Sequence, residues 1–117
     1  MSMRKLLAVC AISAAFFTIP ALSQPVAAED INDWIKQRCT SEWPADYRMQ
    51  VYCIRKQIEG AQEIGRLAGG EASNGDLREI LSTCVSEWGG PGKNADWRMI
   101  SYCYSKQREA WQTMKKL

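Results

Sequence analysis

The chain contains the same stretch twice, and this duplication constrains its fold more than any other feature. Most of the stretch at residues 39–62 occurs again, in the same order, at residues 84–112. The matched pairs are Cys39/Cys84, Ser41/Ser86, Glu42/Glu87, Trp43/Trp88, Ala45/Ala95, Asp46/Asp96, Arg48/Arg98, Met49/Met99, Tyr52/Tyr102, Cys53/Cys103, Lys56/Lys106, Gln57/Gln107, Glu59/Glu109 and Gln62/Gln112. Agreement at so many ordered positions indicates an internal repeat of one supersecondary unit. The second copy is longer at one place, where residues 89–94 replace Pro44 of the first.

Residues 1–28 have the layout of a secretory signal peptide. Two basic residues precede an apolar run over residues 6–17, and small residues end at Ala28. We expect cleavage after Ala28, with Ser23 as the alternative site. A transmembrane anchor and a lipoprotein are the alternatives, but the run is shorter than the roughly 20 residues that span a bilayer. Cys10 also lies inside the run, whereas a lipid-modified cysteine follows it. The sequence therefore predicts a periplasmic or secreted protein without stable membrane insertion after cleavage.

The charge of the predicted mature chain is balanced. Residues 1–28 hold two of the 15 basic residues and none of the 13 acidic ones. A neutral chain gives no electrostatic reason to expect nucleic acid or anionic lipid as a partner. A chain of this size buries limited apolar surface and usually needs cross-links.

Four cysteines remain after the predicted cleavage, and in an exported chain they predict two disulfides. Three pairings are possible. In both copies the first cysteine stands four residues before the tryptophan and the second stands seven after the aspartate, so the extra residues fall only between these flanks. Both cysteines of a copy therefore lie at similar heights from the turn of an antiparallel hairpin. We predict Cys39–Cys53 and Cys84–Cys103, and the pairings between copies remain alternatives.

Apolar residues at spacings of three and four predict helices throughout, without strands. The first helix is expected over about 31–42, and the N-caps expected for the four helices are Asp30, Asp46, Asp76 and Asp96. On the last helix the pattern predicts one apolar side, made of Met99, Tyr102, Cys103, Ala110, Met114 and Leu117. We therefore predict an all-α protein of two tandem disulfide-stapled helical hairpins, residues 29–67 and 76–117, joined by a linker over residues 68–75.

The sequence contains no histidine, which excludes Ser-His-Asp and Cys-His catalytic sites. The cysteines lack the C-x-x-C spacing typical of zinc and redox sites. We expect no metal, no cofactor and no catalytic residue, and predict that the protein is not an enzyme.

Several polar residues occur in both copies, and structural roles are expected for them. Gln57 and Gln107 lie on the cysteine face, where a buried amide can tie a helix to a neighbouring backbone; contact with a ligand is the alternative. Arg48 and Arg98 follow the turns, where each can form an ion pair with the glutamate at the end of the preceding helix or bind an anion.

All five tryptophans follow the predicted signal peptide, and core packing is the first expectation for them. Trp97 and Trp111 replace Tyr47 and Ala61 of the first copy, so the shared hairpin does not require them. The turn 89–94 is the largest difference between copies; drift in a tolerant loop is the simpler explanation, and contact with a partner is the hypothesis to test. The candidate binding residues are Trp88, Lys93, Trp97 and Trp111.

The motif Cys-x3-Trp, followed by Asp-[Tyr/Trp]-Arg-Met-x2-Tyr-Cys-x3-Gln, covers most of each copy. It resembles a motif of small bacterial exported proteins to which no activity is attached, so the resemblance implies a bacterial source and no function. The sequence predicts a small exported interaction protein that binds an unknown protein, as an inhibitor or an envelope accessory. The alternative is a binder of small ligands or envelope glycans.

Overall fold

In the computed structural model the described residues are 28–117, and they form four helices without strands. The helices are α1 (Ala28–Glu42), α2 (Tyr47–Ala68), α3 (Gly75–Glu87) and α4 (Trp97–Met114). The all-α prediction is confirmed. The predicted signal peptide and Cys10 lie outside the described residues, apart from Ala28. Within residues 28–117 no helix combines the length and the apolar character needed to cross a bilayer.

Consecutive helices form two hairpins, each closed by one disulfide. Cys39–Cys53 links α1 to α2 with a Cα–Cα distance of 5.6 Å, and Cys84–Cys103 links α3 to α4 with one of 5.7 Å. Both distances are typical of disulfides. The predicted pairing within each copy is confirmed.

The helices that follow the two turns start as predicted. Asp46 accepts a hydrogen bond from the backbone N–H of Met49 (3.1 Å), and Asp96 accepts one from that of Met99 (3.2 Å). Each carboxylate satisfies an amide of the first helical turn that has no partner within the helix. The repeated aspartate therefore sets the start of α2 and of α4.

The other two N-cap predictions are wrong. Because α1 begins at Ala28, Asp30 lies inside its first turn rather than before it. Because α3 begins at Gly75, the N-cap position falls on Asn74, whose side chain makes no capping hydrogen bond. Asp76 is instead an acidic residue of the first turn, where the helix dipole favours a negative charge.

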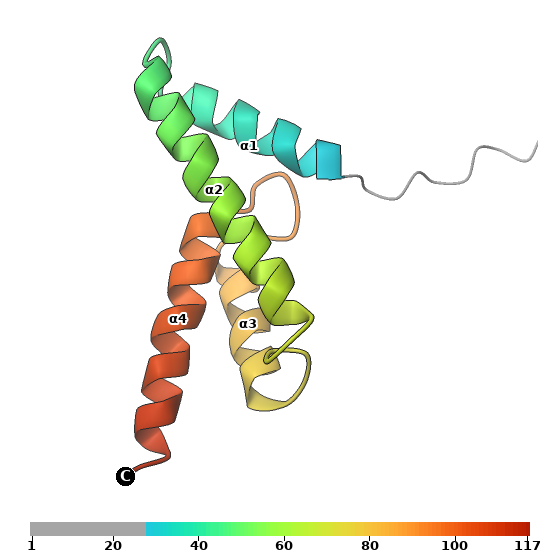
Figure 1. Ribbon diagram of the computed structural model, residues 1–117, viewed down its shortest axis with the longest axis vertical. Coiled ribbons are helices and arrows are strands. Elements are labelled where there is room, and N and C mark those ends of the chain that lie inside the picture. The colour runs from blue at the N-terminus through green and yellow to red at the C-terminus, as the bar shows by residue number, and fades with distance from the viewer. Residues whose placement is uncertain (1–27) are drawn as a thin grey trace, which may run out of the picture.

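The hairpins pack on each other mainly through α2 and α4, which cross as Figure 1 shows. Gly60 of α2 lies at the crossing: a Cβ placed on it would be 2.5 Å from the backbone oxygen of Trp97. Only glycine allows this approach. One core runs through both hairpins, made of Ile35, Cys39, Cys53, Ile64, Leu67, Ala72, Leu81, Cys84, Ala95, Trp97, Ile100 and Tyr104.

A buried glutamine joins the hairpins at this crossing. The side-chain amide of Gln57, 5% exposed, donates to Asp96 Oδ1 (2.8 Å), and its oxygen accepts the backbone N–H of Trp97 (2.8 Å). The predicted role of Gln57 is confirmed. Gln107, its counterpart, is exposed and makes no hydrogen bond among the interactions of residues 28–117, so the same prediction is wrong for it.

The predicted apolar side of α4 is largely wrong. The buried residues of this helix are Trp97, Ile100 and Tyr104, whereas Tyr102 and Met114 are 57% and 68% exposed. The reason is that α4 packs on α2 as well as on α3. This packing buries the neighbouring stripe of Trp97, Ile100 and Tyr104 instead of the predicted one. Ala110 of α4 and Leu117, which follows the helix, are exposed as well.

The segment between the hairpins, within the predicted linker 68–75, is fixed to α4. Ala72 is 2% exposed, and Glu71 accepts hydrogen bonds from Tyr104 Oη (2.9 Å) and Arg108 Nη2 (3.1 Å). The bond from Tyr104 is the main cause that lowers the pKa of Glu71. Burial, followed by this bond, raises the pKa of Tyr104 to about 12.

The turn 89–94 is also held in place, from the side of α1. Arg38 donates through Nη1 to the carbonyls of Asn94 and Ala95 (both 3.2 Å) and through Nη2 to Asp96 Oδ2 (3.1 Å). Its Nε donates to Glu42 Oε1 (3.0 Å). The predicted pairing of Glu42 with Arg48 is therefore wrong, because Arg38 takes the carboxylate.

Candidate functional site

A groove of about 400 Å³ runs between α3 and α4 on the second hairpin. It is lined by Asp76, Glu79, Ile80, Thr83, Cys84, Glu87, Cys103, Gln107 and Trp111. The lining residues of α3 recur every three or four positions along the helix, so they share one helical face. The disulfide lies in the groove, and Gln107 lines it as well. We call this the α3/α4 groove.

The electrostatics of the α3/α4 groove are one-sided. Three of its lining residues are carboxylates, Asp76, Glu79 and Glu87, and none is basic. Carboxylates on neighbouring turns of one helix repel each other and attract a cation. The groove therefore favours a positively charged group.

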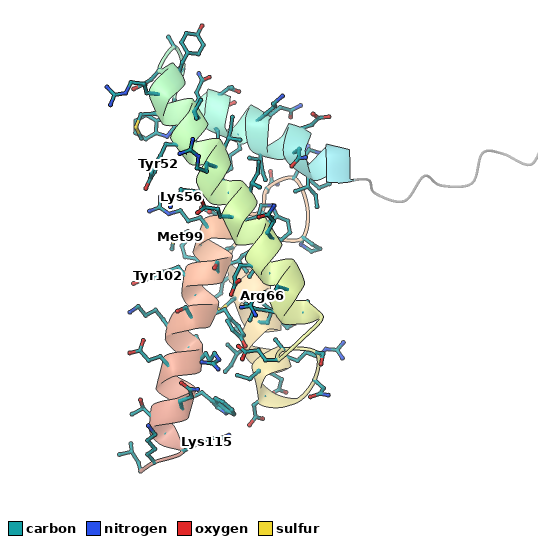
Figure 2. All side chains as sticks on the ribbon, viewed as in Figure 1. Tyr52, Lys56, Arg66, Met99, Tyr102 and Lys115 are labelled. Atoms are coloured by element: carbon teal, nitrogen blue, oxygen red, sulfur yellow. A yellow bond between two sulfur atoms is a disulfide. The ribbon has the colours of Figure 1, made fainter. Side chains whose placement is uncertain are left out.

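Trp111 closes one end of the groove. Its indole Nε1 donates to Asp76 Oδ2 (3.2 Å), which bridges α4 and α3. The ammonium group of Lys115 lies 3.7 Å from the centre of its ring, as a cation–π contact. Figure 2 labels Lys115 at the C-terminal end of α4. The tryptophan is thus held in one orientation as a wall, with one ring face occupied by the lysine.

The first hairpin has an equivalent face, but the chain itself covers it. The disulfides align Cys39 with Cys84 and Cys53 with Cys103, so Ile35 corresponds to Ile80. Ile35 is 2% exposed, and on the same face Arg38 and Gln57 form hydrogen bonds with residues 94–97, at the end of the turn and the start of α4. Among residues 28–117 nothing covers the matching face of the second hairpin, which remains a groove.

The four candidate binding residues do not form one site. Trp111 lines the α3/α4 groove. Trp88 is 37% exposed after the end of α3, while Trp97 is 7% exposed in the core. Lys93 lines a separate hollow with Trp34 of α1.

Two further hollows show no comparable one-sided charge. One, of about 490 Å³, lies between α2 and α4 and contains both acidic and basic side chains; there the hydrogen bond from Arg66 lowers the pKa of Glu63. The other, about 210 Å³, includes Tyr52 and Met99, which Figure 2 shows on one edge of the α2 and α4 pair. Lys56 lies 5.8 Å from the ring centre of Tyr52.

Sequence reasoning missed most of the α3/α4 groove. It assigned Asp76 to helix capping and left Thr83 without a role. The usable signal was the spacing of Asp76, Glu79, Thr83 and Glu87, which places one threonine and three acids on a single face of α3.

Comparison of the chain with protein-family models, curated proteins and solved structures found no match. The geometry of the groove is therefore the basis for a function.

Proposed function

We propose that the protein is an exported interaction protein that binds a segment of another protein in its α3/α4 groove. The observation that carries this proposal is the difference between the two copies. One face of the first hairpin is buried by the rest of the chain, and the matching face of the second is open. In the first hairpin, the face beside the disulfide thus binds another segment of the same chain. In the second hairpin, the equivalent face is free to bind a segment of another protein.

Export is supported by the signal-peptide pattern of residues 1–28 together with the two disulfides. Both disulfides engage all four cysteines of residues 28–117, so none of these is a free thiolate for metal binding or redox catalysis. Binding rather than catalysis also agrees with a sequence that has no histidine. The partner would then meet the protein outside the cytoplasm.

A glycan in the groove is the weaker alternative. Sugar binding commonly uses an exposed aromatic face, but Lys115 occupies one face of the Trp111 ring. The indole N–H of Trp111 is likewise taken by Asp76. Both contacts favour a protein segment that lies along the groove over a sugar that stacks on its end wall.

The test is site-specific photocrosslinking in the cells that produce the protein. A benzophenone amino acid is placed at position 83, inside the groove, or at position 82, which is exposed on α3 and does not line the groove. We expect a discrete protein adduct from position 83 that position 82 does not give. The same adducts from both positions, or none from position 83, would refute the proposal.

A further inference from the structure

Arg38 shows what the repeated unit does with the face beside its disulfide. Each nitrogen of its guanidinium donates a hydrogen bond: Nε to Glu42, Nη1 to two backbone carbonyls, and Nη2 to Asp96. Three of these four bonds cross to the second hairpin. In the first hairpin, Arg38, which is paired with Glu42, therefore links this face to the segment that covers it, residues 94–96.

The second hairpin keeps the glutamate and lacks the arginine. By the alignment of the disulfides, Glu87 corresponds to Glu42 and Thr83 to Arg38. The two glutamates occupy the same place: Glu42 Oε2 lies 3.7 Å from the sulfur of Cys53, and Glu87 Oε2 lies 3.6 Å from that of Cys103. A disulfide sulfur carries no proton, so neither contact is a hydrogen bond.

The carboxylate of Glu87 therefore has a preformed position without its cation. No ion pair in the described part of the chain involves Glu87, whereas Glu42 binds Arg38 at 3.0 Å. Asp76 and Glu79 add negative charge along the same groove, and Thr83 leaves room where Arg38 fills the first hairpin. The groove matches a guanidinium in charge and in the geometry of its acceptor.

We propose that the α3/α4 groove binds an arginine side chain of the partner protein, with its guanidinium on Glu87 in the place that Arg38 takes on Glu42. This inference rests on the proposed function and names the chemistry of the bound segment. Arginine suits the site better than lysine because its planar fork reaches a carboxylate and neighbouring acceptors at once. The first hairpin provides the precedent, because Glu42, the counterpart of Glu87, binds the guanidinium of Arg38.

A second copy of the chain does not fit the groove in the manner of the internal contact. That contact places the N-cap Asp96 against Arg38 and Gln57. Its repeat counterpart, Asp46, would bring a carboxylate into a groove of carboxylates without an arginine. Ala110 also stands where Gly60 permits the close approach of a backbone. Both differences favour a cationic segment of another protein over a second copy.

The test is titration of the full chain, with both disulfides formed, with N-acetyl-arginine amide, followed by NMR. We expect saturable shifts of the Trp111 indole N–H and of the Gln107 side-chain amide. N-acetyl-citrulline amide has nearly the same shape without the charge and should give no such shifts. Glu87→Gln should weaken arginine binding about tenfold, whereas the matched change Glu42→Gln should not, because Glu42 lies outside the groove.

Thr83→Arg provides an independent variant that is expected to fold. Its own arginine should pair with Glu87 and abolish the shifts caused by the added arginine amide. Equal binding of citrulline amide, or unchanged arginine binding by the Glu87 and Thr83 variants, would overturn the inference. So would a dimer in sedimentation that Glu87→Gln dissolves, since it would assign the groove to a second copy. If arginine binding failed in one of these ways but the crosslink from position 83 to another protein remained, the proposed function would stand and the bound segment would not be recognised through an arginine.

Discussion

The close crossing of α2 and α4 predicts opposite effects for two glycines of the same helix. Alanine stabilises a helix interior by about 1 kcal/mol relative to glycine. At Gly65 a new Cβ would meet nothing within 4 Å, so Gly65→Ala should stabilise the protein by about that amount. At Gly60 the Cβ would lie 2.5 Å from the backbone oxygen of Trp97 and 2.8 Å from the nitrogen of Arg98.

The cost at Gly60 follows from these distances. An ordinary contact needs about 3.4 Å, so α4 must move by about 1 Å, which costs about 1–3 kcal/mol as overpacking. The same movement stretches the bond between Gln57 and the N–H of Trp97, now 2.8 Å, which is worth about 1 kcal/mol. After the helix gain is subtracted, Gly60→Ala should lose about 2 kcal/mol, equivalent to roughly 10 °C in Tm for a domain of this size.

Urea and thermal unfolding followed by circular dichroism measure both variants against the parent chain. The disulfides stay oxidised throughout, so that only packing changes. Gly60→Ala should lower the midpoint while Gly65→Ala raises it. If both variants gained stability equally, the backbones of α2 and α4 would not approach each other at Gly60, and the packing of the two hairpins described above would be wrong.

Three further predictions concern the contacts between the hairpins. Gln57→Leu leaves the buried backbone N–H of Trp97 without a partner and should lower the free energy of unfolding in urea by about 2–4 kcal/mol. Gln107→Leu should change it by no more than about 0.5 kcal/mol. Equal losses would contradict the role of Gln57 in joining the hairpins. Because the pKa of Tyr104 is raised to about 12, its neutral form stabilises the fold fully below about pH 10, and this contribution should fall as pH rises to 12. Tyr104→Phe should flatten the pH dependence of stability over that range, and parallel curves would refute the assignment. Replacing residues 89–94 by one proline should lower the free energy of unfolding by about 2 kcal/mol, because Arg38 loses the carbonyl of Asn94 as an acceptor. Loop length alone implies a smaller change. A loss below about 1 kcal/mol would show that the bonds from Arg38 to the turn contribute little.

The sequence was sufficient for features that each copy determines locally. The disulfide pairing follows from distances along two helices, and the caps at Asp46 and Asp96 follow from a carboxylate placed before a helical turn. These features repeat, so each copy supports the assignment made for the other. Asp30 and Asp76 lacked that support, and both N-cap assignments were wrong.

The arrangement between the copies was not predictable in the same way. Two stripes of α4 have apolar residues at helical spacing, one with Tyr102 and Met114 and the other with Ile100 and Tyr104. Only the position of α2 decides which one is buried, and that position depends on contacts between residues about 40 apart in the chain. Trp111 was predicted as a binding residue from its difference between copies, and it does line the groove. Thr83 is the counterpart of Arg38 in the second copy. The significance of this difference becomes clear only from the packing, which shows that Arg38 binds residues 94–96.

The two disulfides join cysteines that are consecutive in the chain, with separations of 14 and 19 residues. A polypeptide emerges from its N-terminus, so Cys39 and Cys53 are both present before Cys84 is made. Among the four cysteines of residues 28–117, the first partner that becomes available in each pair is also the native one. If the chain is exported as proposed, this order allows it to reach the native pairing without exchanging an earlier bond, and the first hairpin can close before the second has followed.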